Sequence, residues 1–74
     1  MELSKNEYRI MLCLMENKGQ VVSREKLMQA LWQSDSFIDD NTLTVNVNRL
    51  SHKLKEAGLD QAIATKFGIG YLLP

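Results

Sequence analysis

Residues 40–57 constrain this chain more than any other stretch, because they separate into an apolar and a polar face when wound as a helix. At about 100° per residue, one narrow arc collects the apolar side chains, which are Leu43, Val47, Leu50, Leu54 and Ala57. This spacing is typical of a helix that packs one face against a core. The opposite face carries mainly hydrogen-bonding and basic side chains, namely Asn41, Thr44, Val45, Asn48, Arg49, His52 and Lys55.

The composition of this polar face has two interpretations. Asn and Thr are mediocre helix formers, so local stability does not account for their number. Asn can pair with adenine, Arg can pair with guanine, and a Val methyl group can touch the thymine methyl group, so the face is suited to reading bases. The alternative is an ordinary solvated face, on which Arg49 would pair with Glu56 or a nearby aspartate.

The ends of this helix carry recognisable signals. Asp40 is the predicted N-cap, and Asp39 adds negative charge near the positive end of the helix dipole. Gly58 suits the left-handed position that follows the last turn. Leu59 can then touch Leu54, as in a Schellman ending.

The preceding residues predict a helix, a short strand and a second helix. Ser4 and Glu7 form a capping box, and Gly19 follows the end of the first helix. A hydrophobic staple of Leu3 with Tyr8 is expected, and the apolar side comprises Tyr8, Met11, Leu12 and Met15, widened by Ile10 and Leu14. Residues 20–22 form a strand, after which Ser23 caps a helix whose apolar side is Leu27, Met28, Leu31 and Trp32.

The remaining segments complete a winged helix-turn-helix. In the connection over residues 33–39, Phe37 and Ile38 are either buried or part of a contact surface. Residues 63–73 predict a β-hairpin, in which Gly68 and Gly70 permit positive φ. We therefore predict one α+β, mainly α domain over residues 1–74. In such a domain the third helix can enter a major groove, and the hairpin can reach the backbone or minor groove.

Composition excludes several other classes of protein. Cys13 is the only cysteine, which rules out an internal disulfide and predicts a buried thiol in a reducing compartment. No apolar run of about 18 residues and no signal-peptide pattern occur, so we expect no membrane span. No catalytic constellation or metal-ligand spacing appears, so we expect no enzyme activity, no cofactor and no metal. The formal net charge of zero gives no support for nucleic-acid binding.

Four motifs, in order, resemble the DNA-binding effector domain of OmpR/PhoB-type response regulators. They are Leu3-Ser4-x-x-Glu7-Tyr8, Val22-Ser23-Arg24-Glu25-x-Leu27-Met28-x-x-Leu31-Trp32, Asp40-Asn41-Thr42-Leu43-x-Val45-x-Val47-x-Arg49-Leu50-x-x-Lys53-Leu54 and Thr65-x-x-Gly68-Ile69-Gly70-Tyr71-Leu72. The run over residues 39–50 most resembles regulators of antimicrobial-peptide and cell-envelope stress responses in Gram-positive bacteria.

The resemblance implies a bacterial, cytoplasmic transcription-factor domain that binds double-stranded promoter DNA at direct-repeat half-sites. It implies a receiver domain, absent from this chain, whose phosphorylation promotes dimerisation. The isolated domain is expected to be a monomer that dimerises on DNA. It implies a small N-terminal sheet, missing here, that would pack against the first helix. Residues 33–39 are implied as a contact for RNA polymerase.

The resemblance also assigns DNA contacts. It places Asn41, Thr44, Val45, Asn48 and Arg49 in the groove, Arg24 and Trp32 on phosphates, and Thr65 and Tyr71 on the backbone beside the wing. Ser51 and His52 occupy positions where the family usually has Arg or Lys, and Phe67 replaces a usual Arg, with Lys66 as its possible substitute. His52 can instead be an ordinary surface residue, and Trp32 an ordinary core residue. Phe67 suits either contact with a DNA sugar or stabilisation of the hairpin. Fewer phosphate partners predict weaker binding. A protein-interaction module with weak or lost DNA binding is the alternative function.

Overall fold

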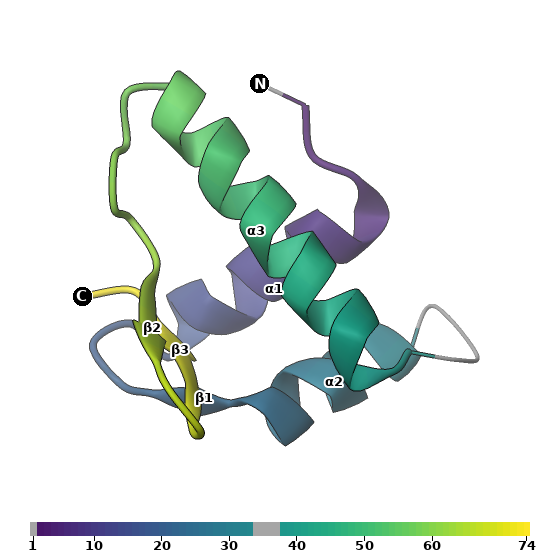
Figure 1. The fold of residues 1–74 in the computed structure, drawn as a ribbon. Helices are drawn as coiled ribbons and strands as arrows, with labels where there is room; N and C mark the ends of the chain where they lie inside the picture. The colour runs from purple at the N-terminus through teal and green to yellow at the C-terminus, as the bar shows by residue number, and fades with distance from the viewer. Residues whose placement is uncertain (1, 34–37) are drawn as a thin grey trace.

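The computed structural model describes residues 2–33 and 38–74, and its element order is the predicted one. The elements are α1 (Lys5–Glu16), β1 (Val22–Ser23), α2 (Arg24–Trp32), α3 (Asp40–Glu56), β2 (Ala64–Lys66) and β3 (Gly70–Leu72). Figure 1 shows α3 crossing in front of α1, with α2 below and the hairpin to one side. The α+β, mainly α architecture of three helices, a short strand and a C-terminal hairpin is therefore confirmed.

The first two helices begin as the sequence predicts. The Ser4 hydroxyl accepts a hydrogen bond from the Glu7 backbone N–H at 3.2 Å, and the Glu7 carboxylate accepts one from the Ser4 N–H at 2.7 Å. The Ser23 hydroxyl accepts from the Lys26 N–H at 3.1 Å and caps α2. Each bond satisfies a backbone donor that the first turn of a helix leaves without a partner.

The N-cap of α3 is Asp39, so the prediction of Asp40 was wrong by one residue. Asp39 has extended backbone angles, and its carboxylate accepts from the Thr42 N–H at 2.7 Å. That bond lowers the pKa of Asp39 below its ordinary value, because it favours the charged form. Asp40 is already helical, and its carboxylate pairs with Arg24 instead.

The end of α3 has the predicted left-handed glycine and the backbone bonds of a Schellman ending, whereas the side-chain contact of Leu59 with Leu54 stays a prediction. Gly58 has φ of 91°, a left-handed conformation that glycine adopts without steric cost. The Gly58 N–H donates to the Lys55 carbonyl at 3.0 Å, and the Leu59 N–H donates to the Leu54 carbonyl at 2.8 Å. These two bonds satisfy carbonyl groups of the last turn and stop the helix.

The core lies between the three helices and the inner side of the sheet. Its members are Ile10, Cys13, Leu14, Val22, Leu27, Leu31, Ile38, Leu43, Val47, Leu50, Leu54, Tyr71 and Leu73. Cys13 is buried as predicted, and burial raises the pKa of its thiol. Ile38 is buried, so the first of the two roles considered for this residue, burial rather than a contact surface, is the one observed. Phe37 lies outside the described residues.

The buried face of α1 differs from the predicted one. Tyr8, Leu12 and Met15 are 58%, 42% and 56% exposed, so the predicted staple does not bury Tyr8. The helix turns its Ile10 and Leu14 side inward, because that side faces the contacts with α2 and α3. Other expected core positions also lie at the surface: Ala57, which caps the end of α3, is exposed, and Trp32 on α2 is 47% exposed.

A partly buried ion pair joins α1 to α3. Glu7 is only 1% exposed, and the Lys53 ammonium group donates to its carboxylate at 2.6 Å. Burial by itself would raise the pKa of Glu7, but hydrogen bonds from Lys53 and Ser4 outweigh it and the pKa is lowered. Lys53 also donates to the Glu2 carbonyl at 3.0 Å, so it holds the start of the chain against α3.

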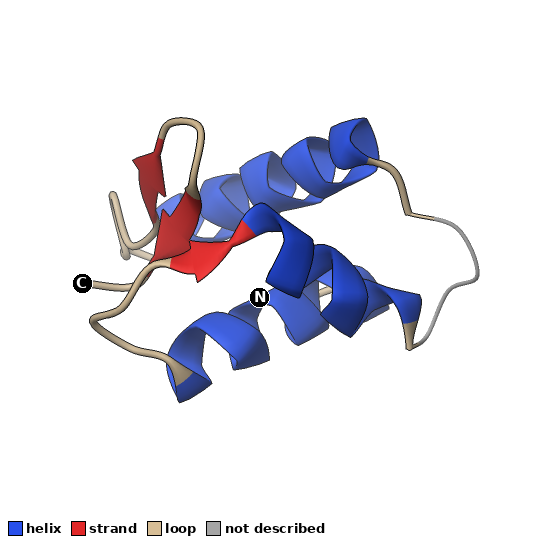
Figure 2. Cartoon of the chain, turned by 90° about the horizontal axis from the view of Figure 1, so that it is seen from below, coloured by secondary structure: helices blue, strands red, loops and turns tan. Residues whose placement is uncertain are grey.

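The three strands form an antiparallel sheet in the order β1-β3-β2, at the start of α2 (Figure 2). Gly68 has φ of 75° in the hairpin turn, as predicted. Gly70 does not have positive φ, and here the prediction was wrong. A Cβ atom on Gly70 would lie 1.9 Å from the Val22 carbonyl oxygen, so glycine permits the close approach of β3 to β1.

Candidate nucleic-acid interface

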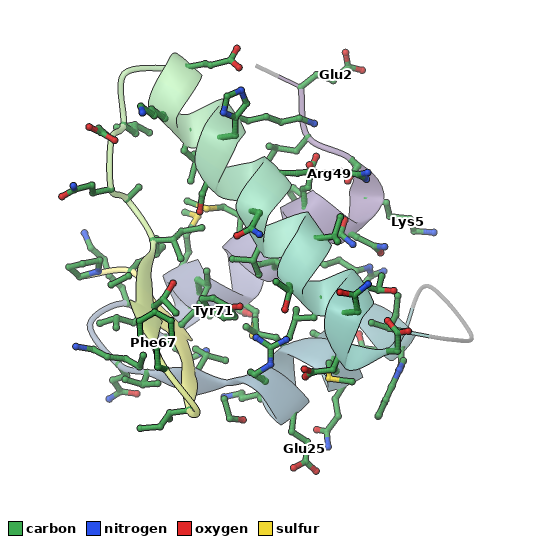
Figure 3. The ribbon with its side chains drawn as sticks, in the orientation of Figure 1. Glu2, Lys5, Glu25, Arg49, Phe67 and Tyr71 are labelled. Carbon is green, nitrogen blue, oxygen red and sulfur yellow. The ribbon has the colours of Figure 1, made fainter. Side chains whose placement is uncertain are left out.

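The outer face of α3 presents a row of side chains away from the core. Asn41, Val45, Asn48 and Arg49 are exposed, whereas Leu43, Val47, Leu50 and Leu54 are buried on the inner face. Figure 3 labels Arg49 midway along the helix. Within the described part of the chain Arg49 forms no ion pair, and the Glu56 carboxylate instead lies 2.6 Å from His52 Nε2. The competing prediction of an Arg49–Glu56 pair is therefore wrong.

Arg24 connects three elements at one end of this face. Its Nε donates to the Asp40 carboxylate at 2.8 Å, and its Nη1 donates to the Tyr71 hydroxyl at 2.7 Å. Its Nη2 donates to the Asp40 carbonyl at 2.8 Å and to the Thr44 hydroxyl at 2.6 Å. The guanidinium carbon also lies 5.6 Å from the centre of the Tyr71 ring. These contacts set the position of α3 relative to β3.

The same contacts decide the charge state of this cluster. The hydrogen bond to Asp40, with help from Tyr71, raises the pKa of Arg24 further above its already high value. The guanidinium is therefore fully charged, but each of its three nitrogen atoms already donates within the protein. Arg24 is only partly exposed, with 25% of its side chain accessible.

A cleft of about 310 Å³ lies between α3 and the wing, which is defined here as residues 63–73. It gathers side chains from α2, α3, β2, β3 and the hairpin turn: Arg24, Thr44, Asn48, Thr65, Lys66, Phe67, Gly68, Gly70 and Tyr71. The lining contains two basic side chains and no acidic one. Hydroxyl, amide and ammonium donors of this kind suit an anionic group such as a phosphate.

The structure places nine of the twelve predicted contact residues in two groups. Thr44, Asn48, Arg24, Thr65, Lys66 and Tyr71 meet at the cleft, and Asn41, Val45 and Arg49 lie exposed along α3. Tyr71 is only 5% exposed, and its hydroxyl accepts from Arg24. Ser51 and His52 lie further along α3, where they line a separate hollow with Lys55 and residues 60–63.

Two residues near the start of α3 have roles that sequence reasoning did not find. The Trp32 indole N–H, predicted to contact phosphate or lie in the core, donates to the Ile38 carbonyl at 3.1 Å. Asp40, predicted as a cap, is the anionic partner of Arg24. The two members of that pair are 16 residues apart, so no local pattern signals their contact.

The sequence matches over residues 1–73 the family described as transcriptional regulatory protein, C terminal. It is 54% identical over 70 residues to the response regulator protein GraR of Staphylococcus aureus (strain MRSA252), which covers 95% of this chain and 31% of GraR. The C-terminal domain of the nisin resistance regulator NsrR, a lantibiotic response regulator, is 46% identical with a TM-score of 0.87, covering 99% of this chain and 74% of that one. The DNA-binding domain of the response regulator AdeR was solved in complex with an intercistronic region. It is 30% identical with a TM-score of 0.86, and the match covers 99% of this chain and 72% of the AdeR domain.

Fold and site together define a winged-helix domain in which the outer face of the third helix is exposed and a basic cleft lies beside the wing. The chain belongs to the family of C-terminal domains of transcriptional regulatory proteins. The predicted resemblance to OmpR/PhoB-type effector domains, and to regulators of antimicrobial-peptide responses among them, is confirmed. The chain spans 31% of the length of the curated relatives it matches. None of the helices in residues 2–33 and 38–74 is both long and apolar enough to cross a membrane.

Proposed function

We propose that residues 1–74 are the DNA-binding domain of a two-component response regulator that controls transcription. The domain binds double-stranded promoter DNA in a sequence-specific manner, with α3 in the major groove and the wing on the neighbouring backbone or minor groove. This assignment agrees with the family of the chain and with the DNA complex of the related AdeR domain.

The observation that carries the proposal is the set of exposed side chains on α3 next to the basic cleft. Asn48 and Arg49 are exposed, and Val45 presents an apolar group between polar neighbours. Arg can pair bidentately with guanine, Asn with adenine, and a Val methyl can touch a thymine methyl. Ser51 and His52 lie further along the same helix, toward the backbone of the DNA.

The cleft supplies the contacts that position the domain on the duplex. Lys66 and Thr65 are exposed on β2, and Asn48 faces the same cleft from α3. Arg24 contacts phosphate through the second N–H of its Nη1, since Asp40, Thr44 and Tyr71 accept from the other four N–H groups. Because such contacts carry no sequence information, they set register and salt dependence, and the exposed face of α3 sets base preference.

The intact regulator supplies the rest of the mechanism. Residues 1–74 form one domain, and a receiver domain elsewhere in the protein promotes dimerisation when it is phosphorylated. The isolated domain is a monomer that pairs on direct-repeat half-sites, and it works in the cytoplasm. The chain has no enzymatic activity of its own.

The test is a titration of the domain with duplex DNA, followed by selection of its preferred site. Log K should fall linearly with log salt, with a slope that counts the phosphate contacts. Arg49→Ala should then weaken specific binding by about 1–3 kcal/mol and relax base preference at one position. Lys5→Ala is the matched control, because Lys5 is exposed on α1, which packs against the inner side of α3. Equal affinity and preference for Arg49→Ala and Lys5→Ala would reject the assigned role.

A protein-interaction function is less well supported by the fold. Its proposed surface was the connection over residues 33–39, but Ile38 is buried there and serves the core. Contact with RNA polymerase would have to use the rest of that connection, including Phe37. Phe37→Ser should reduce capture of RNA polymerase without changing DNA affinity. Capture that is unaffected by this substitution would remove the polymerase contact from the proposal.

A further inference from the structure

The hairpin turn of the wing exposes two large apolar side chains. Phe67 is 92% exposed and Ile69 is 61% exposed. The Ile69 N–H donates to the Lys66 carbonyl at 2.9 Å, and Gly68 between them has φ of 75°. This pattern is a type II turn, whose second position accepts most residues and is favoured by proline.

The fold does not use the Phe67 ring. A side chain that is 92% exposed buries almost no surface, so it stabilises neither the hairpin nor the core. The turn is closed by the backbone of Lys66 and Ile69 and by the positive φ of Gly68, which leaves the ring without a structural task. Hairpin stability, one of the two roles considered for Phe67, is therefore wrong.

The position of the ring specifies what can cover it. Phe67 lines the cleft that also contains Lys66 and Asn48, and Figure 3 shows it with Tyr71 on the hairpin side of α3. A partner here must offer an apolar surface directly beside an anionic one. The minor-groove edge of DNA does so, because the C–H faces of each deoxyribose lie between phosphates. Proteins use apolar side chains, including Phe, as wedges against minor-groove base steps.

We propose that Phe67 packs against deoxyribose in the minor groove next to the major groove occupied by α3. This inference rests on the proposed function. Lys66 pairs with the adjoining phosphate, and Phe67 adds an uncharged contact that salt does not screen.

The test compares Phe67 variants of the 74-residue chain on its selected duplex site at several salt concentrations. Phe67→Ala should weaken binding about tenfold, the size expected if about half of a Phe side chain leaves water, with an unchanged salt slope. Phe67→Arg should restore affinity at low salt and steepen the slope by about 0.9. Ile69→Ala is the matched control, because Ile69 belongs to the same turn and does not line the cleft; it should bind as the unaltered chain does. Thermal midpoints of all three variants should stay unchanged.

The outcomes separate this inference from the proposed function. Normal DNA binding by Phe67→Ala, within about twofold, would overturn the wing-tip contact and leave the DNA-binding function standing. A shallower salt slope for Phe67→Ala would also overturn it, because loss of an apolar contact releases no counterions. Dissociation of a dimer by Phe67→Ala with unchanged DNA affinity would assign the ring to a second copy of this chain instead. An unaltered chain that fails to bind duplex DNA at low salt would reject the proposed function itself.

Discussion

Replacing Lys53 by Met should destabilise the domain through a residue 46 positions away. The Lys53 ammonium group is 2.6 Å from the Glu7 carboxylate, which is 1% exposed. Met keeps the length and helix preference of the side chain and removes only its charge. Glu7 would then remain buried, and among the described residues the Ser4 backbone N–H would still donate to its carboxylate.

The expected loss follows from the burial of the two partners. Removing one partner of a buried pair costs about 3–5 kcal/mol, and a hydrogen bond to a charged group is worth about 1.5–3 kcal/mol. The Lys53 side chain is 37% exposed, so water can reach part of the site and the lower range applies. We expect about 2 kcal/mol, or a fall in Tm of roughly 8–16 °C for a domain of this size.

The assay is urea denaturation followed by circular dichroism at neutral and acidic pH. The folded-state pKa of Glu7 lies below its ordinary value of 4.5, so the pair stabilises the fold above that pH. Its contribution is lost as pH falls through the folded-state pKa, and the difference between Lys53→Met and the unaltered chain should shrink there. Lys55→Met is the control, since Lys55 is exposed on the same turn. A loss below about 0.5 kcal/mol at neutral pH, or one that does not change with pH, would refute the reasoning.

Three further expectations concern other parts of the fold. Gly70→Ala should cost at least about 2 kcal/mol in urea denaturation, because its new Cβ would meet the Val22 carbonyl; a loss near zero would mean that β1 can move away. Cys13 should react slowly with a thiol reagent at pH 8 and rapidly in denaturant, since burial raises its pKa; equal rates would show that the thiol is accessible. Asp39→Ala should cost about 1 kcal/mol through loss of the N-cap of α3. Asp40→Asn leaves that cap in place and should instead weaken the hydrogen bonds around Arg24. A larger thermal loss from Asp40→Asn, with no effect of Asp39→Ala, would identify Asp40 as the cap.

Local patterns were sufficient for the elements of this fold. The capping box of Ser4 and Glu7, the cap at Ser23 and the left-handed Gly58 all depend on residues a few positions apart. The two faces of α3 follow from the helical repeat alone, which is why its inner face and the exposure of Arg49 were predictable. The winged-helix order then followed from the sequence of these elements.

The tertiary structure decided which side chains meet across those elements. Glu7 with Lys53 and Arg24 with Asp40 and Tyr71 are separated by 16 to 47 residues, so their contacts depend on how the helices and wing pack. The same packing turned Tyr8 outward on α1. Helical periodicity determines which residues share a face, but the direction of that face is set by the neighbours that bury it. The sequence therefore determined the two faces of α3, and the packing of α2, α3 and the wing determined the cleft beside it.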